Sequence, residues 1–384
     1  MTLLKNHHFC SKCVLPNGFL YNRLDENGVC DFCRDSSFST SNWKKIQITN
    51  EMRECALQDW KNTIVTIQNS SKDSYDCIVG YSGGKDSTAL LDMLVNELDL
   101  KVLALTIDMG LMTEVAKNNI KQTLNRLEYQ NHHVLIEDAT NTFSKLYKYL
   151  FLNHHSHTYA LTLTICDYCS DLIHSIMVKE AIIRKIPLII LGYSSDQIKR
   201  YFYEIPEKEM RTEWIPDFIR ENPFTEEDRE WFLTNKDLKN ASFPRIILPY
   251  HILEYDEASL IKRVTSKGLI TQGHTDPVLT NCHVVKAGLM YDLYRYGGIP
   301  YALQYAESVR QEEVSKRPRT RKKWLRLYKS VGNAILTGTF AKEGIEMFLS
   351  QIGISKNDLL ERIERELASD PNRDIIKENI KVLE

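Results

Sequence analysis

Residues 77–94 read CIVGYSGGKDSTALLDML, and this stretch decides the fold. The apolar run before SGGKDS predicts a strand, and the run after it predicts a helix. Glycines let a backbone approach a phosphate closely, and the first amides of a helix point free N–H groups toward an anion. Lys85 adds a positive charge, and Ser82 and Ser87 add hydroxyl donors. We therefore expect an anion cradle at residues 82–87.

The loop does not match a Walker A sequence, which requires GxxxxGK[ST]. It resembles the SGGKDS signature of the PP-loop ATP pyrophosphatases. That resemblance implies an enzyme that splits ATP between the α and β phosphates, transfers AMP to a substrate oxygen, and lets a nitrogen or sulfur nucleophile displace the AMP. It also implies that ATP phosphates bind to Ser82, Gly83, Gly84, Lys85, Asp86 and Ser87. Mg²⁺ would bridge the phosphates, with Asp86 a ligand directly or through water. A chance glycine turn is the alternative.

The whole chain has the composition of an ordinary globular protein. Its 384 residues can bury one large core with accessory modules, and its formal net charge of −2 gives no global nucleic-acid signature. No apolar run is long enough for a transmembrane helix, and Met1–Phe9 lacks the apolar centre of a signal peptide. We expect a cytoplasmic protein without membrane contact, in which disulfides are not expected.

Apolar and helical patterns alternate after the glycine loop. The runs 102–107, 133–136 and 187–192 predict further strands, with helices at 114–127 and 172–185. This alternation predicts an α/β fold with a doubly wound parallel sheet, which the resemblance makes PP-loop/HUP-like.

Ligands of such sheets bind beyond the carboxyl ends of the strands. We place the adenine and ribose near Thr106, Ile107 and Asp108, with Gly192 at another strand end. Asp108 has a second interpretation, as a helix cap or turn residue.

We expect three domains. Residues 1–40 form a zinc-binding knuckle, 41–300 the PP-loop ATP pyrophosphatase domain, and 301–384 a helical C-terminal region. An insertion at about 199–245, rich in aromatic residues, acids and prolines, either covers the active site or packs against the sheet.

The N-terminal domain carries two CxxC pairs, Cys10 with Cys13 and Cys30 with Cys33. Four thiolates suit tetrahedral Zn²⁺, and a segment this short needs the metal for its folding energy. A structural zinc site is the prediction. Reduced cysteines without a metal and a redox-active pair are the alternatives.

A third CxxC, Cys166 with Cys169, stands just before the helix expected at 172–185, and Cys282 follows far downstream. This layout resembles the iron–sulfur tRNA thiolation enzymes, the two-thiocytidine and two-thiouridine synthetases. The resemblance implies that the three cysteines hold a four-iron four-sulfur cluster with one open iron site, and that they, Lys85 and Asp86 are catalytic. The alternatives are zinc binding, inert packing, or a persulfide on Cys169 or Cys282.

The ends of the chain resemble a different branch, the N-acetyl sugar amidotransferases of surface-polysaccharide synthesis. The matching segments are Cys10–Pro16, Asp25–Arg34, Tyr75–Ile78, Met112–Ile120 and Phe348–Lys356. In that branch ammonia from a glutaminase displaces the AMP. The three further cysteines favour sulfur as the nucleophile, because an ammonia-dependent enzyme has no need of them. A third hypothesis is that the chain is a non-catalytic ATP-binding module.

The expected partners follow from these readings: a sulfur donor or a glutaminase subunit, with tRNA and a second copy of the chain left open. The dense basic run Lys316–Arg326 offers charges for RNA phosphates, with Trp324 or Tyr328 stacking on a base. It equally suits the phosphates of ATP or a sugar nucleotide, or a solvated helix face.

Overall fold

The chain folds into two compact units, which we call the helical unit and the sheet unit. The helical unit comprises Met1–Asn42, Leu146–Asp167 and His283–Glu384, and the sheet unit comprises Trp43–Lys145 and Tyr168–Cys282. The computed structural model describes residues 8–35, 48–69, 74–194, 201–210, 215–239, 243–280, 282–339 and 341–384. Each unit is described by itself below.

A six-stranded sheet organises the sheet unit, in the order β3-β2-β1-β4-β6-β5. The first five are parallel, and β5 pairs with β6 in the antiparallel sense. The strands are β1 (Cys77–Gly80), β2 (Val102–Ile107), β3 (His133–Ile136), β4 (Leu188–Ile190), β5 (Glu204–Ile205) and β6 (Arg245–Ile247). The doubly wound parallel sheet expected from the sequence is confirmed.

The central strands β1, β2 and β4 are mostly apolar and are buried along nearly their whole length, because both faces of the sheet are covered. Val79 of β1 pairs with Ala104 of β2 on one side and with Ile190 of β4 on the other, and all three side chains are buried. This register brings the carboxyl ends of β1, β2 and β4 to one edge of the sheet. The glycine loop begins at that edge.

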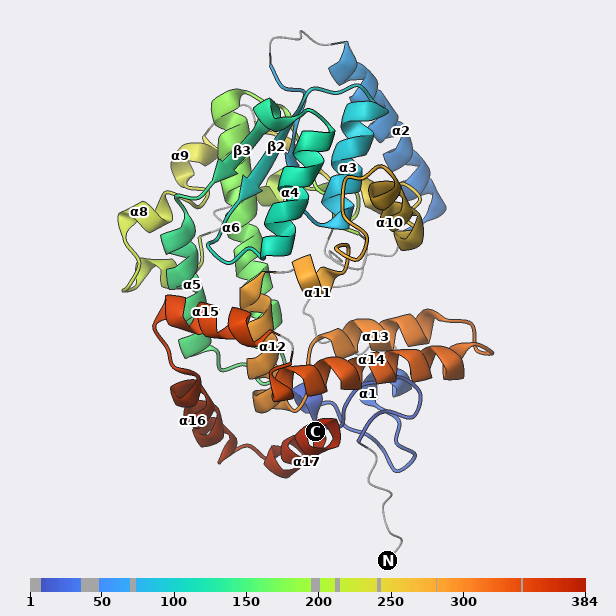
Figure 1. Ribbon diagram of the computed structural model, residues 1–384, viewed down its shortest axis with the longest axis vertical. Coiled ribbons are helices and arrows are strands. Elements are labelled where there is room, and N and C mark those ends of the chain that lie inside the picture. The colour runs from blue at the N-terminus through green and yellow to red at the C-terminus, as the bar shows by residue number, and fades with distance from the viewer. Residues whose placement is uncertain are drawn as a thin grey trace, which may run out of the picture. The chain divides into compact units, whose positions relative to one another are not determined.

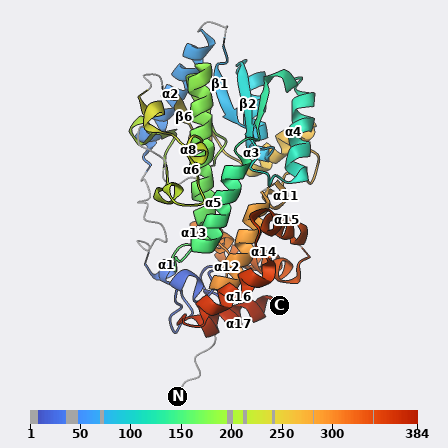
Figure 2. The ribbon, with the colours of Figure 1, turned by 90° about the vertical axis from the view of Figure 1, so that its left-hand side faces the viewer.

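Helices cover both faces of the sheet, and Figures 1 and 2 show α4 and α6 on opposite sides of it. Trp60 of α2 and Leu90 of α3 belong to the same buried cluster as Val79. The longer helices are α2 (Asn50–Gln68), α3 (Lys85–Asn96), α4 (Glu114–Arg126), α5 (Thr140–Asn153), α6 (Leu161–Arg184) and α10 (Glu257–Ser266). The short ones are η2 (Gln130–His132), α7 (Glu207–Met210), η3 (Asp217–Arg220), α8 (Glu226–Arg229), α9 (Asn235–Leu238), η4 (Pro249–His251) and α11 (Pro277–Thr280).

The sequence placed the start of α6 wrongly. The helix begins at Leu161 instead of residue 172, so Cys166 and Cys169 lie within it. Asp292 explains the early start, because its carboxylate accepts the backbone N–H groups of Leu161 (2.8 Å) and Thr162 (3.0 Å). This carboxylate satisfies two first-turn donors from a position 131 residues away from Leu161, which no local pattern reveals.

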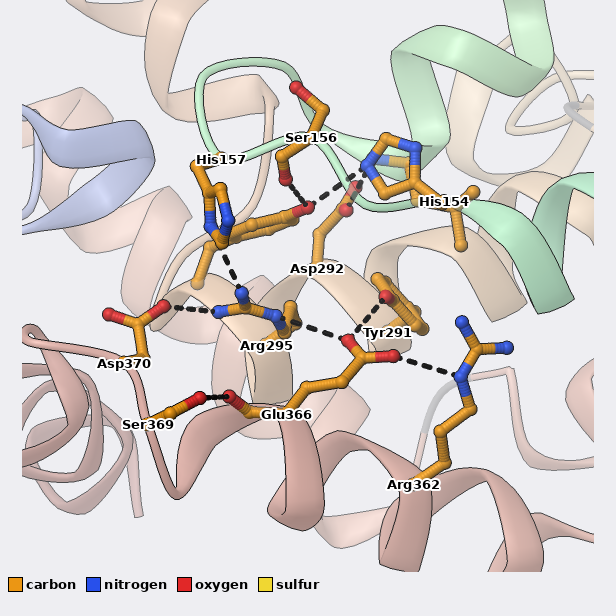
Figure 3. Close-up of polar contacts among 12 residues, drawn as sticks. His154, Ser156, His157, Tyr291, Asp292, Arg295, Arg362, Glu366, Ser369 and Asp370 are labelled. Atoms are coloured by element: carbon orange, nitrogen blue, oxygen red, sulfur yellow. Dashed lines mark hydrogen bonds and ion pairs between the residues drawn. The ribbon is translucent and has the colours of Figure 1, made fainter.

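The helical unit contains η1 (Phe19–Tyr21), α1 (Asp31–Arg34), α12 (His283–Tyr296), α13 (Tyr301–Gln311), α14 (Arg317–Thr337), α15 (Lys342–Ile352), α16 (Lys356–Leu367) and α17 (Arg373–Leu383). A buried polar cluster joins α12 to the loop after α5 and to α16 (Figure 3). Arg295 is its centre: it contacts Asp370 at 2.7 Å, Glu366 at 3.4 Å and Nδ1 of His157 at 3.2 Å. Nε2 of His154 lies 2.9 Å from the hydroxyl of Tyr296.

None of the helices in the described part of the chain combines the length and the apolar character that crossing a membrane requires.

Candidate functional site

The glycine loop lies between β1 and α3, and two glycines let it fit there. Gly83 has φ +74°, and a Cβ on it would stand 2.4 Å from the carbonyl oxygen of Ala116. Gly192, just beyond β4, approaches the first turn of α3, where an added Cβ would stand 3.2 Å from the backbone nitrogen of Ser87. The loop therefore requires glycine at position 83, and at position 192 a Cβ would crowd the start of α3.

The first turn of α3 leaves its amide donors without a side-chain cap. Its N-cap is Gly84, which has no side chain to cap the free N–H groups of the helix. Ser87 directs its hydroxyl to the carbonyl oxygen of Gly84 at 3.2 Å, and the Ser82 and Ser87 hydroxyls lie 3.1 Å apart. Uncapped amides, a helix dipole and hydroxyl groups are all features that favour an anion at a helix start.

Lys85 is the first residue of α3, and it is only 5% exposed. Its Nζ lies 3.0 Å from Oδ2 of Asp86 and 3.2 Å from Oε1 of Glu257. Burial favours the neutral amine, but the Asp86 carboxylate and then the Glu257 carboxylate outweigh it and raise the pKa of Lys85. The loop thus carries a buried, fully charged ammonium.

Three residues of this site were not found from the sequence. The hydroxyl of Tyr255 donates to Oδ1 of Asp86 at 2.9 Å, and that of Tyr250 donates to its backbone carbonyl at 3.1 Å. Nδ2 of Asn119, on α4, donates to the carbonyl oxygen of Gly83 at 2.9 Å. The segment 247–255 stands out in the sequence as a run of apolar and aromatic residues, but nothing there indicates what its tyrosines bind.

The expected nucleoside positions also lie at the carboxyl edge of the sheet. The hydroxyl of Thr106 is buried and donates to the carbonyl oxygen of Tyr81 at 2.7 Å, while Nε2 of His133 lies 2.9 Å from the same hydroxyl. Asp108 accepts the N–H of Gly110 at 2.8 Å, as a turn residue does. Adenine or ribose binding at Thr106, Ile107, Asp108 and Gly192 stays a prediction.

Cys10, Cys13, Cys30 and Cys33 come together in the helical unit, with their Sγ atoms within 4.8 Å of one another. Four thiolates about 2.3 Å from a tetrahedral zinc ion stand about 3.8 Å apart. The separation of 3.6 Å between Sγ of Cys13 and Sγ of Cys30 is close to that value. The group therefore fits a Zn²⁺ ion.

The basic run of residues 316–326 falls largely in α14, and its Arg321 binds the backbone of the cysteine knuckle. Nε of Arg321 donates to the carbonyl oxygens of Cys10 (3.0 Å) and Cys13 (2.7 Å). Trp324 stacks on Tyr305 with 4.6 Å between the ring centroids. The idea that Tyr328 stacks on a base is wrong, because Tyr328 is 0% exposed and packs edge-on against Phe9.

That Cys166, Cys169 and Cys282 bind an iron–sulfur cluster stays a prediction. Cys166 is exposed, and Cys169 and Cys282 are half-buried. Cys282 immediately precedes α12, which begins at His283. Three-residue spacing within α6 puts Cys166 and Cys169 on one face of the helix, with Cβ atoms about 5–6 Å apart.

Solved structures that are distantly similar to this chain include two enzymes. One is the U34-tRNA thiolase NcsA from Methanococcus maripaludis with its [4Fe-4S] cluster, at 14% identity and a TM-score of 0.37, with 84% of this chain and 88% of that one covered. The other is the NH3-dependent NAD synthetase from Campylobacter jejuni subsp. jejuni NCTC 11168 in complex with the nitrate ion, at 12% identity and a TM-score of 0.35, covering 73% and 96%. No family model and no curated protein matches the sequence. Similarity at this level carries no argument about function.

Proposed function

We propose that the chain is an ATP-dependent adenylating transferase of the PP-loop type. One observation carries the proposal: the loop Ser82–Ser87 joins a central parallel strand to an uncapped helix start with a buried ammonium beside it. Uncapped amides and a fixed positive charge at the carboxyl edge of a parallel sheet suit a nucleotide polyphosphate.

The residues of the loop have separable tasks. The amides at the start of α3 and the hydroxyls of Ser82 and Ser87 would hold phosphate oxygens, and Lys85 would stabilise the charge that develops as pyrophosphate leaves. Asp86 is fixed by Lys85 and Tyr255 and presents a carboxylate beside the phosphates. That donor fits Mg²⁺, which would neutralise phosphate charge when bound. A carbonyl oxygen of the substrate then attacks the α phosphate.

We further propose that sulfur is the second nucleophile. Cys166, Cys169 and Cys282 are three thiols that an ammonia-dependent enzyme would not need. Their thiolates suit a four-iron cluster, which would supply sulfide to the adenylated carbon. The substrate is then a tRNA base or a small molecule with a carbonyl oxygen. Amidation with ammonia from a glutaminase remains the competing proposal. It is favoured by the segments Cys10–Pro16 and Asp25–Arg34, which resemble the N-acetyl sugar amidotransferases.

Two measurements test these proposals. Purified protein should convert ATP to AMP and pyrophosphate when its acceptor is present, and Lys85→Ala should abolish that conversion without lowering the melting temperature by more than a few degrees. Undiminished pyrophosphate release in Lys85→Ala would reject the active site. Anaerobic purification separates the nucleophiles: broad visible absorption that is lost in Cys169→Ser supports sulfur, whereas a colourless protein with ammonia-dependent turnover supports amidation.

A further inference from the structure

Glu257 lies far from the glycine loop in sequence, yet its carboxylate contacts the lysine of the loop. Oε1 of Glu257 stands 3.2 Å from Nζ of Lys85. Glu257 is the first residue of α10, whose N-cap Asp256 accepts the N–H of Ser259 at 2.9 Å. A carboxylate in the first helical turn is stabilised by the helix dipole. The start of α10, rather than the loop itself, therefore sets the position of Glu257.

The two carboxylates beside Lys85 are held to different degrees. Both carboxylate oxygens of Asp86 are engaged, Oδ2 by Lys85 and Oδ1 by Tyr255, and its side chain is 16% exposed. The side chain of Glu257 is 60% exposed. Moving Glu257 into water therefore costs less than moving Asp86, because the carboxylate of Glu257 is already largely hydrated. Moving Asp86 would leave the Tyr255 hydroxyl without that acceptor.

We propose that Glu257 competes with phosphate for Lys85. An ammonium group has three N–H donors, and Asp86 takes one of them. Lys85 is almost wholly buried, and of its two carboxylate partners Glu257 is far more exposed than Asp86, so the side of the ammonium that Glu257 occupies is the more open to an incoming phosphate. Phosphate oxygens then replace the exposed carboxylate of Glu257, while Asp86 stays in place.

This inference rests on the phosphate-binding role proposed for the loop, and it adds a residue that sets the affinity of that loop. Together with Asp86, the carboxylate of Glu257 stabilises the protonated form of Lys85 and balances its positive charge, which agrees with the raised pKa of Lys85. Its competition weakens the binding of any phosphate, including pyrophosphate. A loop with such a competitor releases its pyrophosphate product more readily than one without it.

Calorimetric titration with pyrophosphate in metal-free buffer tests the competition. Glu257→Gln should bind pyrophosphate about fivefold more tightly than the wild type, as expected for removal of one exposed ion pair. Glu254→Gln is the matched control: it removes an equal charge from an exposed residue three positions away, and it should change the affinity less than about twofold. Equal or weaker binding by Glu257→Gln overturns the inference.

A second measurement needs no phosphate. Competitive acetylation of the lysines at pH 8, read by peptide mass spectrometry, should label Lys85 faster in Glu257→Gln, because losing a carboxylate lowers the pKa of Lys85. Unchanged labelling overturns the inference. Faster labelling with unchanged pyrophosphate affinity overturns the competition alone. Faster labelling with no pyrophosphate binding in either protein overturns the competition and the proposed function together.

Discussion

The hydroxyl of Tyr255 donates a 2.9 Å hydrogen bond to Oδ1 of Asp86, although 169 residues separate the two in sequence. The bond fixes the carboxylate that lies beside the loop lysine, so a side chain from the segment beyond β6 helps to shape the candidate site. Of the two side-chain contacts described for the Asp86 carboxylate, only the ion pair with Lys85 would remain without this bond.

Replacing Tyr255 by Phe should therefore lower activity without unfolding the protein. A hydrogen bond to a charged group contributes about 1.5–3 kcal/mol, so AMP formation should fall about tenfold or more. Tyr203→Phe is the control, because its hydroxyl also donates to a carboxylate, Asp59, at 2.7 Å but away from the loop. It should lose stability and keep its activity. Equal rates of AMP formation in Tyr255→Phe and the wild type would remove Asp86 positioning from the mechanism.

Gly83 should tolerate no side chain. Gly83→Ala combines a positive φ with a contact of 2.4 Å to the carbonyl of Ala116, so nucleotide binding should be lost. Gly273 offers a matched control, with φ +88° and nothing within 4 Å of an added Cβ. Gly273→Ala should bear only the backbone cost of about 1–2 kcal/mol and still bind ATP. Measuring the ATP affinity of both variants tests this prediction. Normal binding by Gly83→Ala would contradict the loop geometry.

The sequence predicted the strands and the position of the glycine loop because their signals are local. Strands 102–107 and 133–136 coincide with β2 and β3, and the glycine loop stands where the strand-to-helix transition placed it. What the sequence could not supply are contacts made across the fold. The start of α6 depends on Asp292, and β5 and β6 are strands of two and three residues, too short to show a period. Glu257 reads as an ordinary first-turn acid of a helix until its contact with Lys85 is seen.

Asp92 of α3 should control stability in a pH-dependent way. It is 0% exposed and contacts Arg263 and Lys267 of the α10 region, Lys267 at 2.7 Å. Burial alone would raise the pKa of Asp92, but hydrogen bonds from Lys267, Asn96 and Arg263 outweigh it and lower the pKa. A carboxyl group with a lowered pKa stabilises the fold above its unfolded pKa of about 3.9 and loses that contribution as the pH falls below it.

Asp92→Asn should therefore lower the free energy of unfolding by about 3 kcal/mol at pH 7, because two cations lose a buried partner. The difference from the wild type should shrink as the pH is lowered from 5 toward 3. Urea denaturation across that range measures it. Glu97→Gln is the control: Glu97 also contacts Arg263 but is half exposed, so its loss should cost less than about 1 kcal/mol. A difference that stays constant with pH would show that Asp92 acts through packing and not through its charge.

The cysteine knuckle should be a metal-dependent part of the fold. Cys10, Cys13 and Cys30 are fully buried without a disulfide, and Arg321 of α14 binds the carbonyl oxygens of Cys10 and Cys13. Isolated protein should therefore contain about one zinc per chain at this site, and a strong chelator should lower its melting temperature. Elemental analysis and thermal unfolding measure both. Cys30→Ser should lose the zinc and melt earlier, whereas Cys55→Ser, at an exposed cysteine of α2, should match the wild type. If Cys30→Ser kept both the wild-type zinc content and the wild-type melting temperature, the four thiols would be a packing cluster, and α14 would be held through Arg321 without any metal.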